Sequence, residues 1–499
     1  MEGSRAYTFR LESESAQGKP ALAFGRMSSL RERAHWLILA FATVLFAVGF
    51  WPGHMNNDSL FMIEQASGAI ELNDHHSPIL TWIWSLGWPL GLRPGPILVL
   101  QVAGFLVGGY LIARAAFGRV AAAFVAVGVA FFPAVFGNLG VVGRDAWFLT
   151  LLALLFGFVV LAARRPDLRR FALVAAAFAG FFCLASRQNA AAAVVIAAVA
   201  GVALVLWPRL ASRRRWARAA IVIACAFAVT VSAVVVASVA PRILGADRAN
   251  PEQYLYLYDL AGLSVREGES EFPSDVYPSA DVATLAATSS IDTIIPLAFG
   301  DPAPIPMPRS PQEVSEMRDA WTDTITDDPL EYLDWRFDVF MSQIGIDSPG
   351  VFIYHPTVDP NMRGYEIAFD LPNDLASGYQ ELFADEALNG HWFHLAWIYL
   401  LLAIPTMTVL LPTPGAPRVV GGLALCAWTY QVGLFFGTMG TQWRFEFPVA
   451  AITVIAATVA VKVLLDQHGE RRHRGTGIEV SPADAPERPS AAPIATASG

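Results

Sequence analysis

PILTWIWSLGWPL, residues 78–90, decides how many times this chain crosses a membrane. The run is apolar and rich in tryptophan, but it is short and is closed by Pro89. A helix needs about 20 apolar residues to cross ~30 Å of hydrocarbon. If the run does not span, the arginine clusters of the later loops all lie on the side of the basic N-terminal segment, which is the positive-inside pattern. We therefore expect 78–90 to form a surface helix outside the membrane.

The conclusion that 78–90 does not span depends on arginine clusters at the ends of apolar runs. They are Arg114 and Arg119, then Arg164, Arg165, Arg169 and Arg170, then Arg209, Arg213, Arg214, Arg215 and Arg218. If 78–90 spanned, these clusters would alternate between the two sides and the pattern would be lost. The charge distribution therefore predicts that both termini are cytoplasmic.

The composition is typical of an integral membrane protein. Of 499 residues, 55% are hydrophobic and 15% are charged, whereas soluble domains carry about 25% charged residues. A transmembrane barrel would show alternating polarity, and this chain shows continuous apolar runs instead. We predict an all-α polytopic membrane protein with about ten spans. They are placed at 36–53, 95–113, 119–137, 145–163, 170–186, 189–207, 217–240, 392–411, 419–439 and 446–465.

These spans divide the chain into five regions. We predict a cytoplasmic N-terminal tail (1–35) without a cleavable signal, a membrane core (36–241) with a first outer loop (54–94), a large outer loop (242–391), C-terminal spans (392–466) and a disordered tail (467–499). The large loop carries 27 acids, seven arginines and no lysine. In it, Ser310 and Asp328 each precede a proline and stand three residues before a glutamate, which predicts two helix starts.

Several functional classes lack support in the sequence. Cys183, Cys225 and Cys426 all fall within apolar runs, so neither a disulfide framework nor a cysteine-based metal site is expected. The GxGxxG and GxxxxGK[ST] patterns of nucleotide-binding loops are absent. We expect neither ATP-driven pumping nor a nucleic-acid partner.

The first outer loop concentrates titratable side chains. WPGHMNNDSLFMIEQASGAIELNDHHSP, residues 51–78, holds four acids and three histidines. Asp58 lies just past the first span, where partial burial tunes the basicity of a carboxylate, and it could also cap the helix that follows. His75 and His76 could bind a phosphate oxygen or a sugar hydroxyl, or accept a proton. With Asp58 and Asp145, His76 could hold a divalent cation such as Mg or Mn.

Further candidate residues lie at the outer ends of later spans. Asp145 begins the fourth span, where an acid is either functional or a helix cap. Arg144, Arg187 and Arg444 stand at the membrane face, where a guanidinium suits bidentate recognition of a lipid phosphate. The arginines could instead anchor the helices in the interface, and Glu446 could form an ion pair with Arg444.

These groups all lie on one predicted side, which has no access to a nucleotide donor. We expect a sugar carried on a polyprenyl phosphate, whose tail lies in the membrane. The phosphate is then the leaving group, arginines and a possible cation stabilise its charge, and a carboxylate accepts the proton of the acceptor hydroxyl. A single displacement inverts the anomeric carbon. The predicted location is the plasma membrane, with the site facing outward.

The order of these motifs resembles that of integral-membrane glycosyltransferases of the GT-C superfamily. The matching elements are Asp58 in PGHMNNDS, HHSP at 75–78, GRD at 143–145, RQN at 187–189 and DPLEYLDWRF from Asp328. The similarity covers 36–207 well, and the rest in outline. A histidine replaces proline in the HPP-like element, and the large outer loop matches no family element. These departures leave the acceptor open, whether glycan, lipid or protein.

The resemblance implies a role for each candidate residue. Asp58 is implied as the catalytic base, and Asp145 with His75 or His76 as orienting groups or metal ligands. Arg187 and Arg444 are implied to lie near the carrier phosphate, while metal dependence differs among family members.

Three other interpretations remain from the sequence. An O-antigen polymerase or ligase would use groups of the large loop, here Arg363 and His355. A lipid-linked sugar transporter or flippase would place ionisable groups at mid-depth of the bilayer, where these spans carry few charges. A non-catalytic scaffold would not need the acid, histidine and arginine set on one side.

Overall fold

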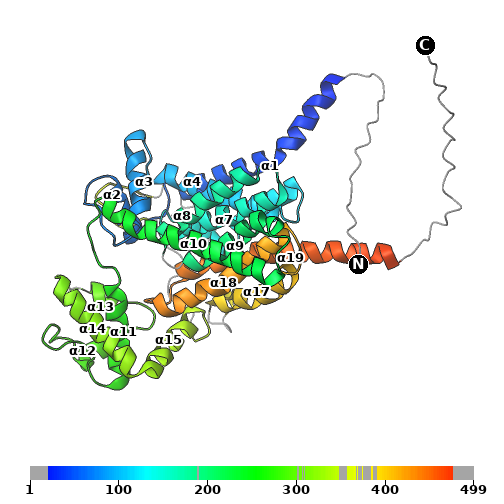
Figure 1. Ribbon diagram of the computed structural model, residues 1–499. Helices are drawn as coiled ribbons and strands as arrows, with labels where there is room; N and C mark the ends of the chain where they lie inside the picture. The colour runs from blue at the N-terminus through cyan, green and yellow to red at the C-terminus, as the bar shows by residue number, and fades with distance from the viewer. Residues whose placement is uncertain are drawn as a thin grey trace, which may run out of the picture.

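The computed structural model describes residues 21–187, 190–300, 303–305, 307, 310–347, 357–366, 368, 374, 384–385 and 390–475. Almost all regular structure in these ranges is helical (Figure 1). The strands found there are the two-residue β1 (Ala384–Asp385) and β2 (Gly390–His391), which pair antiparallel. The predicted all-α membrane fold is confirmed.

A helix or bent helix pair lies at each of the ten predicted spans, but the helix at 392–411 is shorter than a membrane-crossing helix. These helices are α1 (Ala21–Phe50), α4 (Pro94–Ala113), α5 (Arg119–Ala130), α6 (Pro133–Leu139), α7 (Arg144–Arg164), α8 (Arg169–Ser186), α9 (Ala190–Arg209), α10 (Arg215–Ile243), α17 (Ala396–Leu410), α18 (Ala416–Gly437) and α19 (Trp443–Gly475). Within the described part of the chain, eight of these are long and apolar enough to cross a membrane. Helices α5 and α6 form a ninth span with a 76° bend, and α17 is a shorter apolar helix of 15 residues.

The 78–90 run forms α3 (Pro78–Gly87) and the 3-10 turn η1 (Trp88–Leu90). At ten residues α3 is too short to span, and Ser77 caps it. Helix α2 (Asn57–Ala66) precedes it. In Figure 1 both helices lie at one end of the bundle, where α3 runs across the direction of the long helices. We call this end of the molecule the α2 end.

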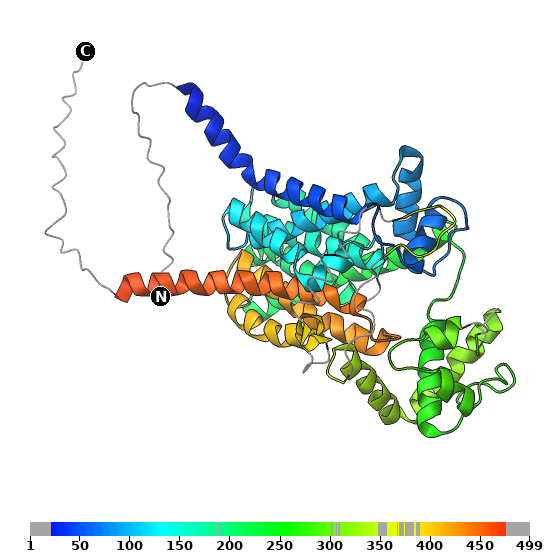
Figure 2. The same cartoon turned by 180° about the vertical axis from the view of Figure 1, so that it is seen from behind.

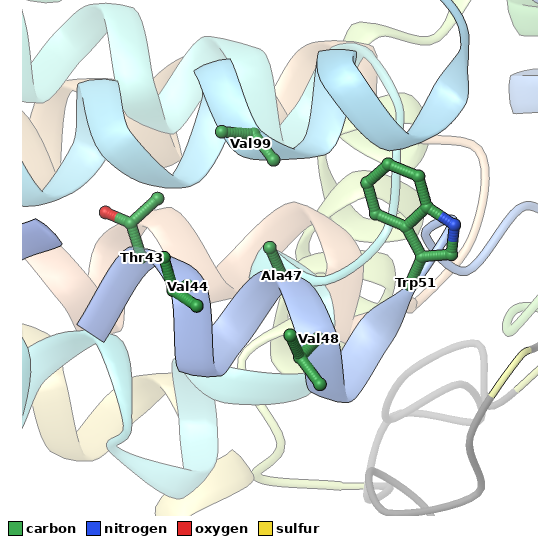
Figure 3. A pocket seen from close by; sticks show the side chains of 6 residues that line it. All are labelled: Thr43, Val44, Ala47, Val48, Trp51 and Val99. Carbon is green, nitrogen blue, oxygen red and sulfur yellow. The ribbon is translucent and has the colours of Figure 1, made fainter. Parts of the chain in front are cut away.

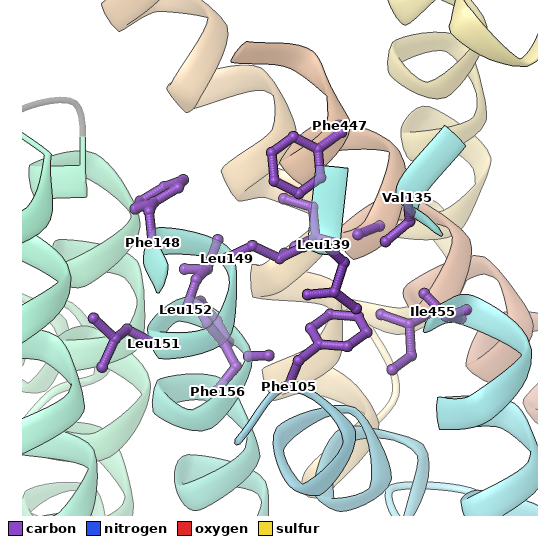
Figure 4. Packing of buried hydrophobic residues seen from close by; sticks show 14 of the residues in the cluster. Phe105, Val135, Leu139, Phe148, Leu149, Leu151, Leu152, Phe156, Phe447 and Ile455 are labelled. Atoms are coloured by element: carbon purple, nitrogen blue, oxygen red, sulfur yellow. The ribbon is translucent and has the colours of Figure 1, made fainter. Parts of the chain in front are cut away.

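The core of the bundle is built around α7, which packs against α4, α8, α9, α18 and α19. Its aromatic and branched side chains interlock with those of neighbouring helices, as the close-up of the packing shows (Figure 4). The backbones of α4 and α7 approach closely at Gly108 and Gly157. A Cβ added at Gly108 would lie 2.5 Å from a backbone atom of Ala153, so only glycine fits there.

Backbone and side-chain contacts fix which helix ends lie together. The Ser77 hydroxyl donates to the carbonyl of Ala185 near the end of α8 at 2.6 Å. Asn73 pairs with Asp247, just after α10. The Trp51 ring covers Gly95 at the start of α4. The ends of α1, α8 and α10 and the start of α4 therefore share the α2 end.

A second group of helices lies at the same end (Figures 1 and 2). It comprises α11 (Gln253–Glu267), α12 (Val282–Thr288), α13 (Ile295–Phe299), α14 (Pro311–Asp327) and α15 (Pro329–Gln343). Ser310 and Glu313 form a capping box on α14, and Asp328 caps α15, as the sequence predicts. The group has its own hydrophobic clusters, one of them around Leu257, Leu260 and Leu285.

Candidate functional site

The loop between α1 and α2 is joined to the loop between α6 and α7 by a short backbone pairing. The His54 N–H donates to the carbonyl of Gly140 at 3.1 Å, and the Val142 N–H donates to the carbonyl of His54 at 2.9 Å. Gly53 turns the chain into this pairing with a φ of +112°, which favours glycine. The pairing brings the start of α2 beside the start of α7. Asp58 and Asp145 therefore lie at the same end of the bundle.

Asp58 stands in the first turn of α2 but does not cap it. The cap is Asn56, whose Oδ1 accepts from the backbone N–H of Ser59 at 3.0 Å, so the interpretation of Asp58 as a cap is wrong. Its carboxylate points out of the helix instead. Arg444 Nη1 donates to Asp58 Oδ2 at 2.7 Å, and His76 Nε2 lies 4.0 Å from Oδ1.

The charge of Asp58 is set by opposing effects. Burial disfavours ionisation of this side chain, but the positive charges of Arg444 and Arg144 outweigh burial and lower the pKa of Asp58 below its usual value. The carboxylate is therefore ionised and paired at neutral pH.

Asp145 stands in the first turn of α7, as Asp58 stands in the first turn of α2. Gly143 is the N-cap of that helix, so Asp145 is not a cap either. Arg187 Nε lies 2.9 Å from Asp145 Oδ1, and Arg144 Nε lies 3.9 Å from the same oxygen. Arg187 Nη1 donates to the hydroxyl of Tyr430 on α18 at 2.5 Å. A second carboxylate–guanidinium pair thus connects α7, α8 and α18.

His75 and His76 differ in exposure, but the pKa of each is lowered. His76 is buried, its ring meets the edge of Phe61, and its Nδ1 has no hydrogen-bond partner among the described residues. Burial, with the nearby Arg144 charge, lowers the pKa of His76 to about 3. Burial also lowers the pKa of His75, whose ring lies 5.3 Å from that of Tyr254 on α11. Both histidines are neutral at physiological pH.

Three guanidinium groups converge on the two carboxylates. Their side chains are largely buried, with exposures of 26% for Arg144, 9% for Arg187 and 26% for Arg444. The Nε atoms of Arg144 and Arg444 are buried without a hydrogen-bond partner among the described residues. Three cations against two anions, with neutral histidines, leave the cluster with one net positive charge. Unsatisfied buried donors and excess positive charge favour an anionic ligand.

Glu446 is not the partner of Arg444. Its carboxylate is fully buried and accepts hydrogen bonds from Gln343 Nε2 at 2.8 Å and from Gln431 Nε2. Arg444 pairs with Asp58 instead, so the expected Arg444–Glu446 ion pair is wrong. Residues two apart on a helix do not face each other, and Trp443 and Arg444 open α19.

The proposed metal set does not fit this arrangement. Among the described residues no three histidine, cysteine or acidic side chains are grouped closely enough to hold a metal ion. Asp58 is paired with Arg444 and Asp145 with Arg187, so guanidinium groups neutralise both carboxylates. Asp58, Asp145 and His76 are therefore not a ready ligand set for Mg or Mn.

Arg363, one of the two candidate residues of the polymerase interpretation, makes its contacts away from this cluster. Arg363 is exposed, donates to the hydroxyl of Ser67 at the end of α2, and lies 5.6 Å from the ring centroid of Trp88. His355 lies outside the described residues. Tyr430 contacts Arg187 and Tyr254 contacts His75, and neither tyrosine is a candidate from the sequence analysis. Tyr430 stands in an apolar span and Tyr254 in the large loop, and neither lies in a recognisable motif.

Comparisons with known proteins give distant structural matches. No protein-family model and no curated protein matches the chain. The chain is similar to the oligosaccharyltransferase AglB of Archaeoglobus fulgidus, solved with an inhibitory peptide and dolichol-phosphate. The TM-score is 0.39 and the identity 15%, over 91% of this chain and 53% of AglB. The chain thus spans about half the length of that protein.

A second similar structure is ArnT of Cupriavidus metallidurans bound to undecaprenyl phosphate. It matches with a TM-score of 0.31 and 16% identity over 87% of this chain and 78% of ArnT. Similarity at this level leaves the activity to be inferred from the residues of the site.

Proposed function

We propose that this chain is a membrane glycosyltransferase that moves a sugar from a polyprenyl-phosphate carrier to an extracytoplasmic acceptor with inversion. The observation that carries the proposal is the cluster of Asp58, Asp145, Arg144, Arg187 and Arg444 at one end of an apolar helix bundle. An excess of one positive charge suits the single negative charge of a sugar phosphodiester. The membrane-level position suits a donor whose tail lies in lipid.

The ion pair between Asp58 and Arg444 has a chemical consequence. A carboxylate held by a guanidinium is a weak base, because the pair lowers its pKa. A donor phosphate that recruits Arg444 would compete with Asp58 for the same donors. Asp58 would then become more basic when the donor is bound, which couples base activation to donor binding.

In the proposed reaction the acceptor hydroxyl attacks the anomeric carbon. Its proton passes to the Asp58 carboxylate as the new glycosidic bond forms. The bond between the anomeric carbon and the phosphate oxygen breaks, and its electron pair stays on the leaving phosphate. Arg144, Arg187 and Arg444 stabilise the charge of that phosphate. Asp145 holds Arg187 in place through its 2.9 Å contact.

The direct test of the proposal is Asp58→Asn. The full chain is reconstituted in vesicles with a panel of polyprenyl-phosphate sugars and a cell-envelope extract, and released polyprenyl phosphate is measured. We expect the variant to lose transfer by at least about 1,000-fold, because general-base catalysis and its coupling to donor binding are both removed. Folding and binding of the lipid donor should be retained.

Glu64→Gln is the matched control for Asp58→Asn. It makes the same change of charge on the same helix, six residues further along α2. This control should keep transfer near the level of the unchanged chain. If Asp58→Asn is tolerated while Arg363→Ala abolishes activity, the polymerase interpretation replaces this proposal.

The sidedness of the site is a part of this proposal. We propose that the chain resides in the plasma membrane with the α2 end outside. A cysteine at Ser67, at the end of α2, should react with an impermeant thiol reagent in intact cells. A cysteine at Ala211, among the arginines between α9 and α10, should react only after the membrane is opened. The reverse result would place the site in the cytoplasm.

A further inference from the structure

Two exposed arginines lie beside Trp88, near the end of the loop 54–94. Arg93 lies with its Cζ 4.0 Å from the ring centroid of Trp88 and donates to the Trp88 carbonyl at 2.8 Å. Arg363 lies 5.6 Å from the same centroid and donates to the Ser67 hydroxyl. Both guanidinium groups are exposed, and neither forms an ion pair with a carboxylate in the part of the chain that the structure describes. Two positive charges therefore stand beside one indole ring.

The helix that carries Trp88 exposes a row of large apolar side chains. Trp82 is 37% exposed, Leu86 55% and Leu90 89%. These residues follow the length of α3 and η1, the helix that lies across the bundle at the α2 end (Figure 1). Apolar side chains next to arginines are typical of a segment that lies in the membrane interface.

An apolar groove on the side of the bundle leads to the same corner. It has a volume of about 210 Å³ between α1 and α4, and it is lined by Thr43, Val44, Ala47, Val48, Trp51 and Val99 (Figure 3). The α1 side chains along it face outward, with Val44 61% exposed and Val48 49%. In a chain that spans a membrane, this surface faces lipid.

Trp51 connects the groove to the arginine pair. Its ring covers Gly95, where an added Cβ would lie 2.3 Å from the indole, and Gly95 is two residues past Arg93. Its carbonyl accepts from the N–H of Ala368 at 2.9 Å, five residues past Arg363. The groove therefore ends at Trp51, whose ring and carbonyl contact residues close in sequence to Arg93 and Arg363.

We propose that this corner binds an anionic phospholipid, with its phosphate at Arg93 and Arg363 and one acyl chain in the α1–α4 groove. Charge complementarity with the two arginines supports an anionic headgroup. The wholly apolar wall of the groove supports an acyl chain as its occupant. The lipid is distinct from the reacting donor, because Ser67 lies nine residues past Asp58 on α2. At 1.5 Å per residue that separation is about 14 Å, too far for transfer. The inference does not depend on the proposed function.

The test is native mass spectrometry of the full chain in detergent with added phosphatidylglycerol or phosphatidylcholine of the same acyl chains. We expect the unchanged chain to retain phosphatidylglycerol about 30-fold better, from two arginines near the surface. Arg93→Gln with Arg363→Gln should remove this preference, while Arg93→Lys with Arg363→Lys should keep most of it. Val44→Phe with Val48→Phe should fill the groove and reduce retention of both lipids.

The matched control is Arg248→Gln with Arg318→Gln. These arginines are also exposed, but each pairs with an acid, Glu252 or Asp319. The control should keep the preference. Equal retention of both lipids by the unchanged chain, or an unaltered preference in the Arg93/Arg363 glutamine variant, would overturn the proposal. Displacement of phosphatidylglycerol by undecaprenyl phosphate would overturn the choice of lipid.

Discussion

Two acid–arginine pairs in this molecule have the same chemistry and opposite surroundings. Asp259 and Arg336 join α11 to α15 with a 2.6 Å contact, and both side chains are completely buried. Asp58 and Arg444 join α2 to α19 at 2.7 Å, and their side chains are 33% and 26% exposed. The first pair lies within the group of helices α11 to α15, and the second lies at the candidate site.

The difference lies in what else the charged atoms contact. The Asp259 carboxylate also accepts from the indole N–H groups of Trp321 at 2.9 Å and Trp335 at 3.0 Å, and Arg336 donates to the carbonyl of Thr438 at 2.7 Å. Among the described residues, Asp58 has Arg444 within hydrogen-bond distance and His76 at 4.0 Å. A pair enclosed by further donors holds a structure together, whereas an open pair is available to a ligand.

The comparison predicts opposite outcomes for the two arginines. Arg336→Gln leaves a buried charge without its partner, which should lower the free energy of unfolding by about 3–5 kcal/mol. Arg444→Gln should change that free energy by about 1 kcal/mol or less, yet reduce transfer by about 100-fold or more through lost stabilisation of the phosphate. Thermal unfolding in detergent and the vesicle assay measure the two effects.

A paired replacement separates loss of charge from loss of contact. Asp259→Leu with Arg336→Met removes both charges and fills their space, so it should recover a large part of the stability lost by Arg336→Gln. If Arg444→Gln unfolds the chain as severely as Arg336→Gln does, the distinction between a closed and an open pair is lost.

The sequence predicts which charged residues lie at the candidate site better than it predicts which of them pair with each other. Charge counting predicts that the 78–90 helix does not span, and this prediction puts Asp58, Asp145, Arg187 and Arg444 at one end of the bundle. These deductions use local signals, namely apolar run length and arginine position. The caps of α14 and α15 are predicted for the same reason, since their residues are neighbours in sequence.

The pairings themselves depend on contacts that periodicity does not encode. Arg444 meets Asp58 across 386 positions and Arg187 meets Tyr430 across 243. The sequence offers Glu446 as an alternative partner of Arg444 because it is two residues away, but helix geometry turns it toward Gln343 and Gln431. Asn56 takes the capping role because it directly precedes α2, and this frees Asp58.

His76, the neutral neighbour of the Asp58–Arg444 pair, provides a test through the pH dependence of stability. The pKa of His76 falls from 6.5 to about 3 on folding, so the unfolded chain binds a proton more readily than the folded one between these values. The folded state should therefore lose stability as the pH falls below 6.5, by about 2 kcal/mol from pH 7 to pH 5. Thermal unfolding at a series of pH values measures the slope.

His76→Gln is the comparison for that slope. It removes the titrating group while keeping a polar side chain, so the loss of stability between pH 7 and pH 5 should become shallower. An unchanged slope would mean that another group controls the pH response, and that His76 is less buried in solution than its contacts indicate.

The smallest expected effect concerns Tyr430, the third member of the Asp145–Arg187 pair. Tyr430→Phe removes one acceptor from Arg187, which keeps its 2.9 Å contact with Asp145. We expect the KM for the lipid donor to rise several-fold, corresponding to about 1 kcal/mol for one hydrogen bond. Tyr399→Phe is the matched control, because its buried hydroxyl donates to the Phe393 carbonyl at 2.6 Å. Both variants should lose similar stability, and only Tyr430→Phe should change the KM. An equal change in the control would mean that Tyr430 acts through the packing of the bundle, and that Arg187 is held by Asp145 alone.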